Sequence, residues 1–232
     1  MHSIGASNSA TIEYMKSKAT KMRHHGHRSY KTEADSTKKR LIGAGTALFS
    51  SRGFKTTTVA QLCKAAGCKK TSFFDLFNNK LALLELIHDE IVAEAYTQVS
   101  NSLMAFTLEN QDLAVRCAVD AFLNTYLEDP RRAKIACIEI VGVHPRLERQ
   151  RHQNIKLFAQ LFAGYANRLR TQGAMATNDF EKTGLMLAGG LNTIIIDWLN
   201  HPNPVSIGQL SQEFDRLIQA CLLGDQMLQS QS

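Results

Sequence analysis

Residues 56–80, TTTVAQLCKAAGCKKTSFFDLFNNK, contain two short apolar repeats separated by a glycine. Apolar side chains recur at helical spacing before Gly67 and again a few residues after it. Glycine readily adopts the left-handed conformation that ends a helix. Two helices joined by so short a turn must cross steeply, which is the geometry of a helix-turn-helix. The stretch therefore predicts this motif, with apolar positions Val59, Leu62 and Ala66 in the first helix and Phe73, Phe74 and Phe77 in the second.

Two lysines, Lys69 and Lys70, fall at the start of the second helix. The helix dipole disfavours a cation at this end by about 0.3–1 kcal/mol, so folding alone does not require the placement. A polyanionic partner explains it, because a helix N-terminus already offers free N–H groups to phosphate. Ordinary solvated charge is the alternative, but the position within a helix-turn-helix favours DNA.

The charge of the 232-residue chain is divided unevenly. Residues 1–80 hold 15 Lys and Arg against 4 Asp and Glu, whereas residues 81–232 hold 12 against 17. The formal net charge of +6 therefore belongs to the N-terminal end. A basic end joined to a mildly acidic remainder indicates a nucleic-acid-binding domain carried by a second domain with another task.

Cysteine usage and hydropathy predict a soluble, cytoplasmic protein. The five cysteines are scattered and mostly embedded in apolar helical patterns, as expected of reduced thiols. Cys63 and Cys68 do not form a CxxC pair, so no zinc site is expected. The most apolar run, residues 185–199, is too short to span a bilayer and contains Asn192 and Asp197. We expect no membrane partner, no bound metal and no cofactor.

Composition divides the chain into three parts. Residues 1–35 are basic and lack sustained periodicity, which predicts a disordered or weakly helical extension. This extension suits either an arm that reaches a DNA minor groove or a merely solvated tail. Residues 36–82 form the predicted helix-turn-helix domain, and residues 83–232 form a second helical domain.

Helical periodicity continues to the end of the chain without a convincing strand, so the predicted fold class is all-α. Prolines and Asn or Asp caps mark several of the helix starts. Besides the two helices of the motif, helices are predicted over about 36–51, 80–106, 112–128, 130–140, 145–172, 180–199 and 207–223.

The helix predicted at 180–199 is apolar almost all round and must bury two faces. It is either the centre of a monomer or a helix that packs on its own core and on a second copy. DNA reading favours the homodimer, because two-fold proteins read two half-sites. The interface candidates are Leu185, Ala188, Gly189, Trp198, Phe214 and Leu217.

The segment from about residue 38 to residue 84 resembles the N-terminal domain of the TetR family of transcriptional regulators. The resemblance implies an all-helical homodimer in which a three-helix N-terminal domain binds a palindromic operator. It also implies a C-terminal domain for dimerisation and for a small-molecule effector that releases the repressor from DNA. The matching residues are Leu48-Phe49, Gly53-Phe54, Thr57-Thr58-Val59, Ala65-Ala66-Gly67, Phe73-Phe74, Phe77, Asn79-Lys80 and Leu83-Leu84.

The same resemblance gives DNA-binding roles to particular residues. Thr58 begins the positioning helix, and Phe74 stands where the family usually has a tyrosine that touches phosphate. Lys80 lies where the following helix meets the DNA backbone and is expected to position the protein. Lys70 and Thr71, and after them Lys69, are the better candidates for base readout. The full set of DNA-binding candidates is Lys39, Thr58, Lys69, Lys70, Thr71, Ser72, Phe74, Asn79 and Lys80.

The sequence defines an effector site less clearly. Aromatic and small polar residues of the C-terminal helices suit either a cavity with a few polar anchors or ordinary core. Because no strongly charged cluster is evident, the prediction is an apolar or aromatic ligand. The candidates are Phe122, Tyr126, Cys137, Phe162, Tyr165 and Asn192.

Three other functions are considered from the sequence. A redox-responsive regulator would use Cys68, which lies beside two lysines. An enzyme is disfavoured because no hydrolase, metalloprotease or phosphate-loop motif appears, although His144, Glu148 and His152 share a helical face and suit a metal. A helical interaction scaffold that lacks sequence-specific DNA binding is the third.

Overall fold

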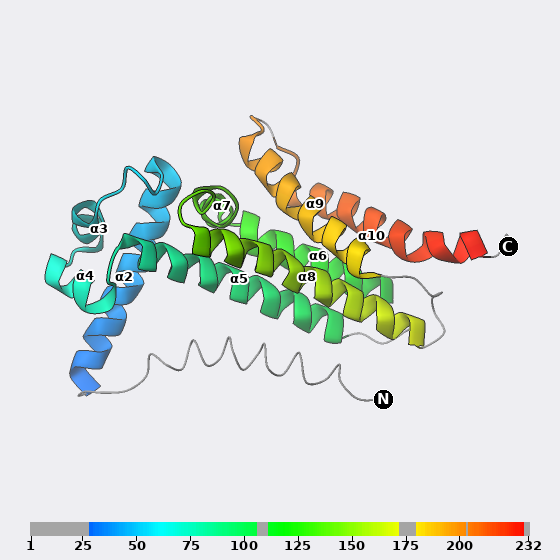
Figure 1. The fold of residues 1–232 in the computed structure, drawn as a ribbon, viewed down its shortest axis with the longest axis horizontal. Helices are drawn as coiled ribbons and strands as arrows, with labels where there is room; N and C mark the ends of the chain where they lie inside the picture. Colours follow the sequence, from blue (N-terminus) through cyan, green and yellow to red (C-terminus); the bar gives the residue numbers. More distant parts are fainter. Residues whose placement is uncertain (1–27, 106–110, 172–179, 203, 230–232) are drawn as a thin grey trace.

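The computed structural model describes residues 28–105, 111–171, 180–202 and 204–229 (Figure 1). All regular secondary structure in these residues is helical, which confirms the all-α prediction. None of the described helices is long and apolar enough to cross a membrane. The elements are α2 (Arg28–Arg52), α3 (Val59–Ala66), α4 (Lys70–Leu76), α5 (Lys80–Met104), α6 (Gln111–Leu127), α7 (Pro130–Lys134), the π-helical turn η2 (Ile135–Glu139), α8 (Pro145–Thr171), α9 (Phe180–Asn200) and α10 (Ile207–Gln229).

Helix α2 begins earlier than the sequence predicted. It starts at Arg28 and not near Ser36, so residues 28–35, which were assigned to the basic extension, are helical. No glycine or proline interrupts residues 28–42, which gives the helix no local reason to stop there. Residues 1–27, the rest of the predicted extension, lie outside the described residues.

Helices α3 and α4 form the predicted helix-turn-helix. Thr58 caps α3 in a reciprocal arrangement: its hydroxyl accepts a hydrogen bond from the Gln61 N–H, and the Gln61 side chain accepts one from the Thr58 N–H. Gly67 ends α3 with φ 61° and ψ 42°, the left-handed conformation expected of it. The Cys68 N–H then donates to the Cys63 carbonyl at 3.0 Å, which closes the turn before α4.

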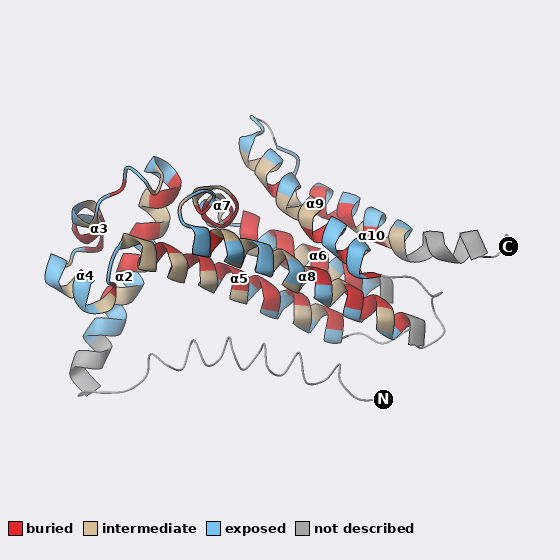
Figure 2. Cartoon of the chain, viewed as in Figure 1, coloured by how far each residue is buried: buried red, intermediate tan, exposed pale blue. Residues whose placement is uncertain are grey.

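Helix α2 packs closely on the start of α5. A Cβ atom on Gly45 would lie 2.7 Å from the end of the Ile87 side chain and 3.1 Å from that of Leu83, so a larger residue at position 45 would require these side chains to shift. Around this contact Phe49, Leu62 and Phe73 are fully buried in one apolar core. Helix α5 then runs from this N-terminal domain into the body, and Figure 2 shows buried residues along it.

The body contains α5, α6, α8, α9 and α10 (Figure 1). Helix α9 packs on α8, where a Cβ atom on Gly184 would lie 2.5 Å from the Ala159 carbonyl oxygen. Helix α10 packs on α6, and the Ser211 hydroxyl donates to the Asp120 carboxylate across that contact. The core is continuous from the N-terminal domain through the body.

The helix predicted at 130–140 is divided in two. Asp129 accepts a hydrogen bond from the Arg131 N–H and begins α7 with Pro130 at its first position, as the sequence indicated. The chain then widens into η2, which nothing in its sequence predicts. This turn packs against α2 as well as α5 and α9, so it lies where the N-terminal domain meets the body.

The predicted dimer residues fall into two groups. Leu185 and Leu217 are 44% and 49% exposed, and Gly189 and Trp198 are half-buried. In contrast, Ala188 and Phe214 are buried within the chain's own core. We therefore correct the prediction for Ala188 and Phe214, because a side chain already enclosed by its own helices presents little surface to a second copy.

Candidate functional site

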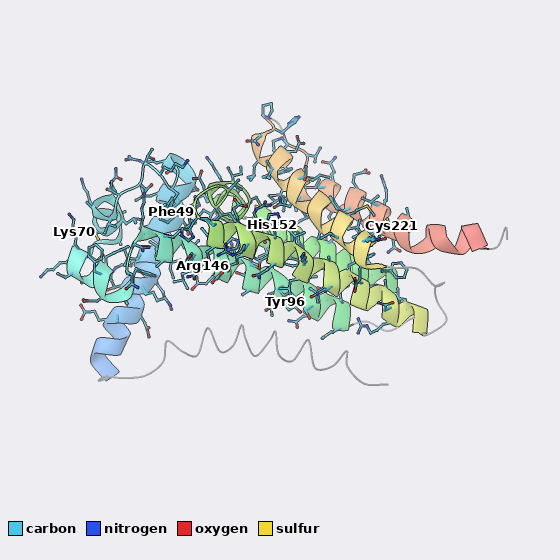
Figure 3. The ribbon with its side chains drawn as sticks, in the orientation of Figure 1. Phe49, Lys70, Tyr96, Arg146, His152 and Cys221 are labelled. Atoms are coloured by element: carbon cyan, nitrogen blue, oxygen red, sulfur yellow. The ribbon has the colours of Figure 1, made fainter. Side chains whose placement is uncertain are left out.

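The first turn of α4 forms an exposed cationic surface at one end of the molecule. Lys69, Lys70 and Thr71 are exposed and Ser72 is half-buried. Figure 3 shows Lys70 at the end of the molecule opposite Cys221. Lys69 occupies the cap position without a side-chain hydrogen bond to the helix. The opposite face of α4 is anchored by Phe73, which is fully buried. The sequence-predicted readout residues are thus together and open to a partner.

Phe74 differs from the other two aromatic residues of this segment. The sequence placed it in one apolar stripe with Phe73 and Phe77, but its side chain is 54% exposed while theirs are buried. Successive residues point about 100° apart around a helix, so adjacent positions 73 and 74 do not share a face. The stripe assignment of Phe74 is therefore wrong, and its assignment to DNA contact stays a prediction.

Thr58 and Asn79 have capping roles at the starts of α3 and α5. The Asn79 side chain accepts a hydrogen bond from the Ala82 N–H at 2.9 Å, and Thr58 caps α3 as described above. Both residues are exposed, as is Lys39 on α2. These caps fix where the two helices begin, and a phosphate contact by any of the three residues stays a prediction.

Lys80 has a different role from the one that the sequence indicated. Its ammonium donates to the carbonyl oxygens of Phe54 at 2.7 Å, Lys55 at 3.1 Å and Thr57 at 2.8 Å. It also lies 4.4 Å from the centroid of the Phe54 ring. An ammonium has three protons, and this geometry occupies all of them inside the protein. Assignment of Lys80 to the DNA backbone does not fit this arrangement, because the ammonium holds the α2–α3 connection instead.

Glu139, which the sequence did not single out, holds the same connection from the other side. Its carboxylate accepts a hydrogen bond from the Phe54 N–H at 2.9 Å. Glu139 is the last residue of η2, whereas Phe54 directly follows the glycine that ends α2. The DNA-binding end is therefore joined to the body by a hydrogen bond between residues far apart in the sequence. No local sequence pattern signals such a contact.

A cavity of about 40 Å³ lies in the body between α5, α6, η2, α8 and α9. Four of the predicted ligand residues line it: Phe122, Tyr126, Cys137 and Asn192. The other two, Phe162 and Tyr165, are not in its wall. The Phe162 ring packs at 6.4 Å from that of Phe180, and the Tyr165 ring lies 5.6 Å from the Arg168 guanidinium.

The cavity wall is more polar than the sequence predicted. His88, Arg151 and Asn154 also line it, and none of them was a candidate. His88 is 2% exposed, and its Nδ1 atom and the Asn154 Nδ2 atom are buried without a hydrogen-bond partner within the described protein. A regular spacing does not reveal them, because they come from two helices that meet only in the folded chain.

The two cavity groups with acidic protons remain neutral at physiological pH. Burial raises the pKa of the Cys137 thiol to about 12. Burial also raises the pKa of Tyr126, which is fully enclosed, well above the ordinary phenol value. Neither side chain therefore places a negative charge in the wall.

The alternative metal site is not supported by the geometry. The Glu148 carboxylate accepts from the Gly142 N–H at 2.7 Å and from Arg151 at 3.3 Å. His152 contacts the Glu148 carbonyl through Nδ1 at 2.8 Å, and His144 accepts from a backbone N–H through the same ring atom. Within the described residues, no group of three or more His, Cys, Asp or Glu side chains is placed to hold a metal ion.

The two cysteines of the helix-turn-helix are close neighbours. Cys63 is buried in α3 and Cys68 is half-buried in the following turn, near enough to affect the Cys63 thiol. Burial, together with the neighbouring Cys68, raises the pKa of the Cys63 thiol. A protonated, enclosed thiol is a poor nucleophile, so only Cys68 keeps the partial exposure that redox sensing requires. The redox hypothesis stays a prediction.

Comparison with known proteins relates this geometry to one family. Residues 41–87 match the family model described as bacterial regulatory proteins, tetR family. This match covers α3, α4, most of the buried part of α2 and the start of α5. Among curated protein sequences, none matches the chain.

Solved structures similar to this chain cover both its N-terminal domain and its body. The fatty acid degradation regulator FadR from Bacillus halodurans superposes with a TM-score of 0.70 at 16% identity, covering 78% of this chain and 94% of that one. FadR from Bacillus subtilis, in complex with stearoyl-CoA, gives 0.68 at 14%, covering 78% and 96%. The TetR-family regulator PfmR from Thermus thermophilus gives 0.64 at 18%, covering 77% and 96%. At these identities the likeness concerns the fold.

Proposed function

We propose that the chain belongs to the tetR family of bacterial regulatory proteins, whose family model matches residues 41–87, and that it is a transcriptional repressor. It binds an inverted-repeat operator as a homodimer and leaves the DNA when a small molecule occupies the cavity in its body. The observation that carries this proposal is the first turn of α4. Lys69, Lys70 and Thr71 are exposed there, while Phe73 is fully buried on the opposite face and fixes the helix to the core. A regulator of this kind works at the chromosomal DNA in the cytoplasm.

Different groups of this turn are suited to the bases and to the phosphates of DNA. The exposed Lys70 and Thr71 side chains suit base edges in the major groove. The free N–H groups of the turn and Lys69 suit phosphate. Each subunit presents one such helix, so a dimer reads two half-sites about 34–36 Å apart or a multiple of this spacing.

The exposed faces of α9 and α10 support the homodimer. Leu185, Met186 and Leu217 are large apolar side chains that are 44%, 69% and 49% exposed. A second copy that covers these side chains removes apolar surface from water, at about 25 cal/mol per Å². Gly189 of α9 is half-buried, and no atom of the described residues outside its own helix lies within 4 Å of the position that a Cβ atom would occupy on it. This space admits close approach of a second helix.

The turn η2 links the cavity to the α2–α3 connection, and this link explains how an effector could release the protein from DNA. Ala136 and Cys137 of η2 line the cavity, and Glu139 at the end of the same turn holds the Phe54 N–H. A ligand that enlarges the cavity displaces η2, and with it the support of the α2–α3 connection. Because α3 begins immediately after that connection, its displacement changes the spacing of the two recognition helices and weakens operator binding.

Similar structures guide the choice of effector. FadR from Bacillus subtilis was solved with stearoyl-CoA, and we propose that this chain also takes a small molecule with a long apolar part. Regulators of this family are typically not enzymes, and we propose no catalytic activity for this one. The cavity serves binding and release.

The decisive experiment is selection of bound duplexes from a random pool with the purified full-length protein. We expect an inverted repeat to be enriched, with an affinity that falls steeply with salt. Lys70→Ala should relax the preference at one or two positions, at a cost of about 1–3 kcal/mol. Lys156→Ala, which removes an exposed lysine from α8, is the matched control and should change nothing. Failure to enrich any sequence would refute the repressor proposal.

A further inference from the structure

Within the residues that the structure describes, two buried polar atoms in the wall of one cavity have no hydrogen-bond partner. His88 Nδ1 is 3.7 Å from the nearest Asp89 carboxylate oxygen, too far for a hydrogen bond. Asn154 Nδ2 is likewise buried and unsatisfied. Buried polar groups in folded proteins almost always have a partner, so such atoms indicate a position that water or a ligand fills. A cavity of about 40 Å³ has room for a few water molecules but not for a drug-sized ligand.

The polar groups of this wall are mainly donors. The Asn154 amide nitrogen donates, the Arg151 guanidinium donates and carries a positive charge, and the His88 ring donates from at least one nitrogen. Nearby carboxylates are already engaged: Glu148 accepts from Gly142 and Arg151, and Asp89 accepts from the Gln150 side chain. Cys137 and Tyr126 stay neutral in this environment. Because Arg151 is itself ion-paired with Glu148, the polar atoms left to meet a ligand are mainly those of Asn154 and His88, and the wall favours a hydrogen-bond acceptor such as a carboxylate oxygen.

The rest of the wall is apolar and aromatic. Phe122 and Phe158 meet edge to face with centroids 5.0 Å apart, and the Tyr126 ring lies 4.7 Å from that of Phe122. Ile155 and Ile195 complete this side. Ligand pockets of drug-sized molecules measure about 300–1,000 Å³, so a ligand must part these side chains to enter. Aromatic side chains in edge-to-face contact can be displaced by a ligand more readily than the backbone of a helix.

From this geometry, and resting on the proposed repressor function, we propose that the effector is an amphipathic carboxylate. Its carboxylate is bound by Asn154, Arg151 and His88, and its apolar chain displaces the rings of Phe122 and Phe158. The sequence predicted an apolar or aromatic ligand because it did not bring these three polar residues together. The folded chain adds a receptor for a negatively charged head group.

The test is calorimetric titration of the purified, DNA-free protein with three probes of equal chain length: sodium decanoate, methyl decanoate and decylamine. We expect decanoate to bind at least tenfold more tightly than the neutral ester, and decylamine to bind most weakly. Asn154→Leu should weaken decanoate binding about tenfold and leave the ester unchanged, because only the charged head needs the amide donor. Gln153→Leu, an exposed neighbour on α8, should behave like the wild type.

Several results would overturn the proposal. These are equal or tighter binding of decylamine, no binding of any probe, and decanoate binding that Asn154→Leu leaves unchanged. Thermal unfolding of Asn154→Leu, compared with the wild type, checks that the variant is still folded. Operator selection by the ligand-free protein tests the repressor function separately. A protein that binds decanoate but selects no duplex would refute that function while the ligand class stands.

Discussion

The ammonium of Lys80 lies 2.7 Å from the carbonyl oxygen of Phe54 and 4.4 Å from the centroid of its ring. The N–H of the same phenylalanine donates to Glu139 at 2.9 Å. Phe54 is therefore held through its carbonyl and ring by the start of α5, and through its N–H by the end of η2. This residue therefore connects η2 and the start of α5 to the segment that leads into α3.

Lys80→Met should destabilise the fold before it affects DNA recognition. Methionine keeps the apolar stem but leaves three carbonyl oxygens without the ammonium, and we expect a loss of about 1.5–3 kcal/mol in the free energy of unfolding. Urea denaturation measures it, with the exposed Lys55→Met as control. Operator affinity should fall for all sequences alike because α3 is displaced. Unchanged stability together with reduced affinity would restore the phosphate role that the sequence indicated.

Glu139→Ala should uncouple the cavity from the DNA-binding domain. The Phe54 N–H loses its acceptor, so its amide hydrogen should exchange faster in the variant. The ratio of operator affinities without and with decanoate should fall toward one, since the ligand no longer acts on the α2–α3 connection. Glu139→Gln keeps an acceptor oxygen and should retain most of the coupling. A release ratio in Glu139→Ala equal to that of the wild type would exclude this path.

Phe74→Tyr should strengthen operator binding. The side chain is 54% exposed, so a hydroxyl at the ring edge costs no buried space. A hydrogen bond to phosphate at this position is worth about 0.5–1.5 kcal/mol, which corresponds to roughly a twofold to tenfold gain in affinity. Fluorescence anisotropy with the selected duplex measures the gain, and thermal unfolding should stay the same. No gain at low salt would show that position 74 does not face phosphate.

Gly45→Ala should destabilise the N-terminal domain, whereas Gly43→Ala should not. The new methyl group at position 45 would lie 2.7 Å from Ile87, and overpacking of this kind costs about 1–3 kcal/mol. At position 43 nothing lies within 4 Å, and alanine in a helix is favoured over glycine by up to about 1 kcal/mol. Chemical denaturation of both variants checks the pair. Equal effects would contradict the close packing of α2 on α5.

The contribution of Glu148 to stability should depend on pH. The hydrogen bond from the Gly142 N–H, helped by Arg151, lowers the pKa of Glu148 below its usual value of 4.5. A carboxyl group whose pKa is lower in the folded state stabilises the fold above about pH 4.5, and this contribution is lost as pH falls through the folded value. The wild type should therefore exceed Glu148→Gln in urea midpoint at pH 7, with the difference shrinking below about pH 4.5. A difference that stays constant as the solution is acidified well below that pH would count against this account.

Local sequence determined most of the secondary structure and the position of the DNA-reading element. Thr58 with Gln61, Gly67, Asn79 and Pro145 each mark a helix end by interactions within a few residues, so their effects can be read without a fold. The exposed lysines at the start of α4 follow from the same local reading. The early start of α2 was missed because no capping residue marks it, and the wider turn of η2 has no local signal at all.

Tertiary structure alone decided which charges are exposed to a partner and which bind within the protein. Lys70 and Lys80 are both lysines at the start of a helix, yet one is exposed and the other donates to carbonyls 23 to 26 residues away in the chain. Glu139 and Phe54 are 85 residues apart, and His88 and Asn154 meet only across α5 and α8. Sequence spacing fixes neighbours within a helix, whereas hydrogen bonds and cavities between helices depend on how the helices cross, which is set by the packing of the whole core.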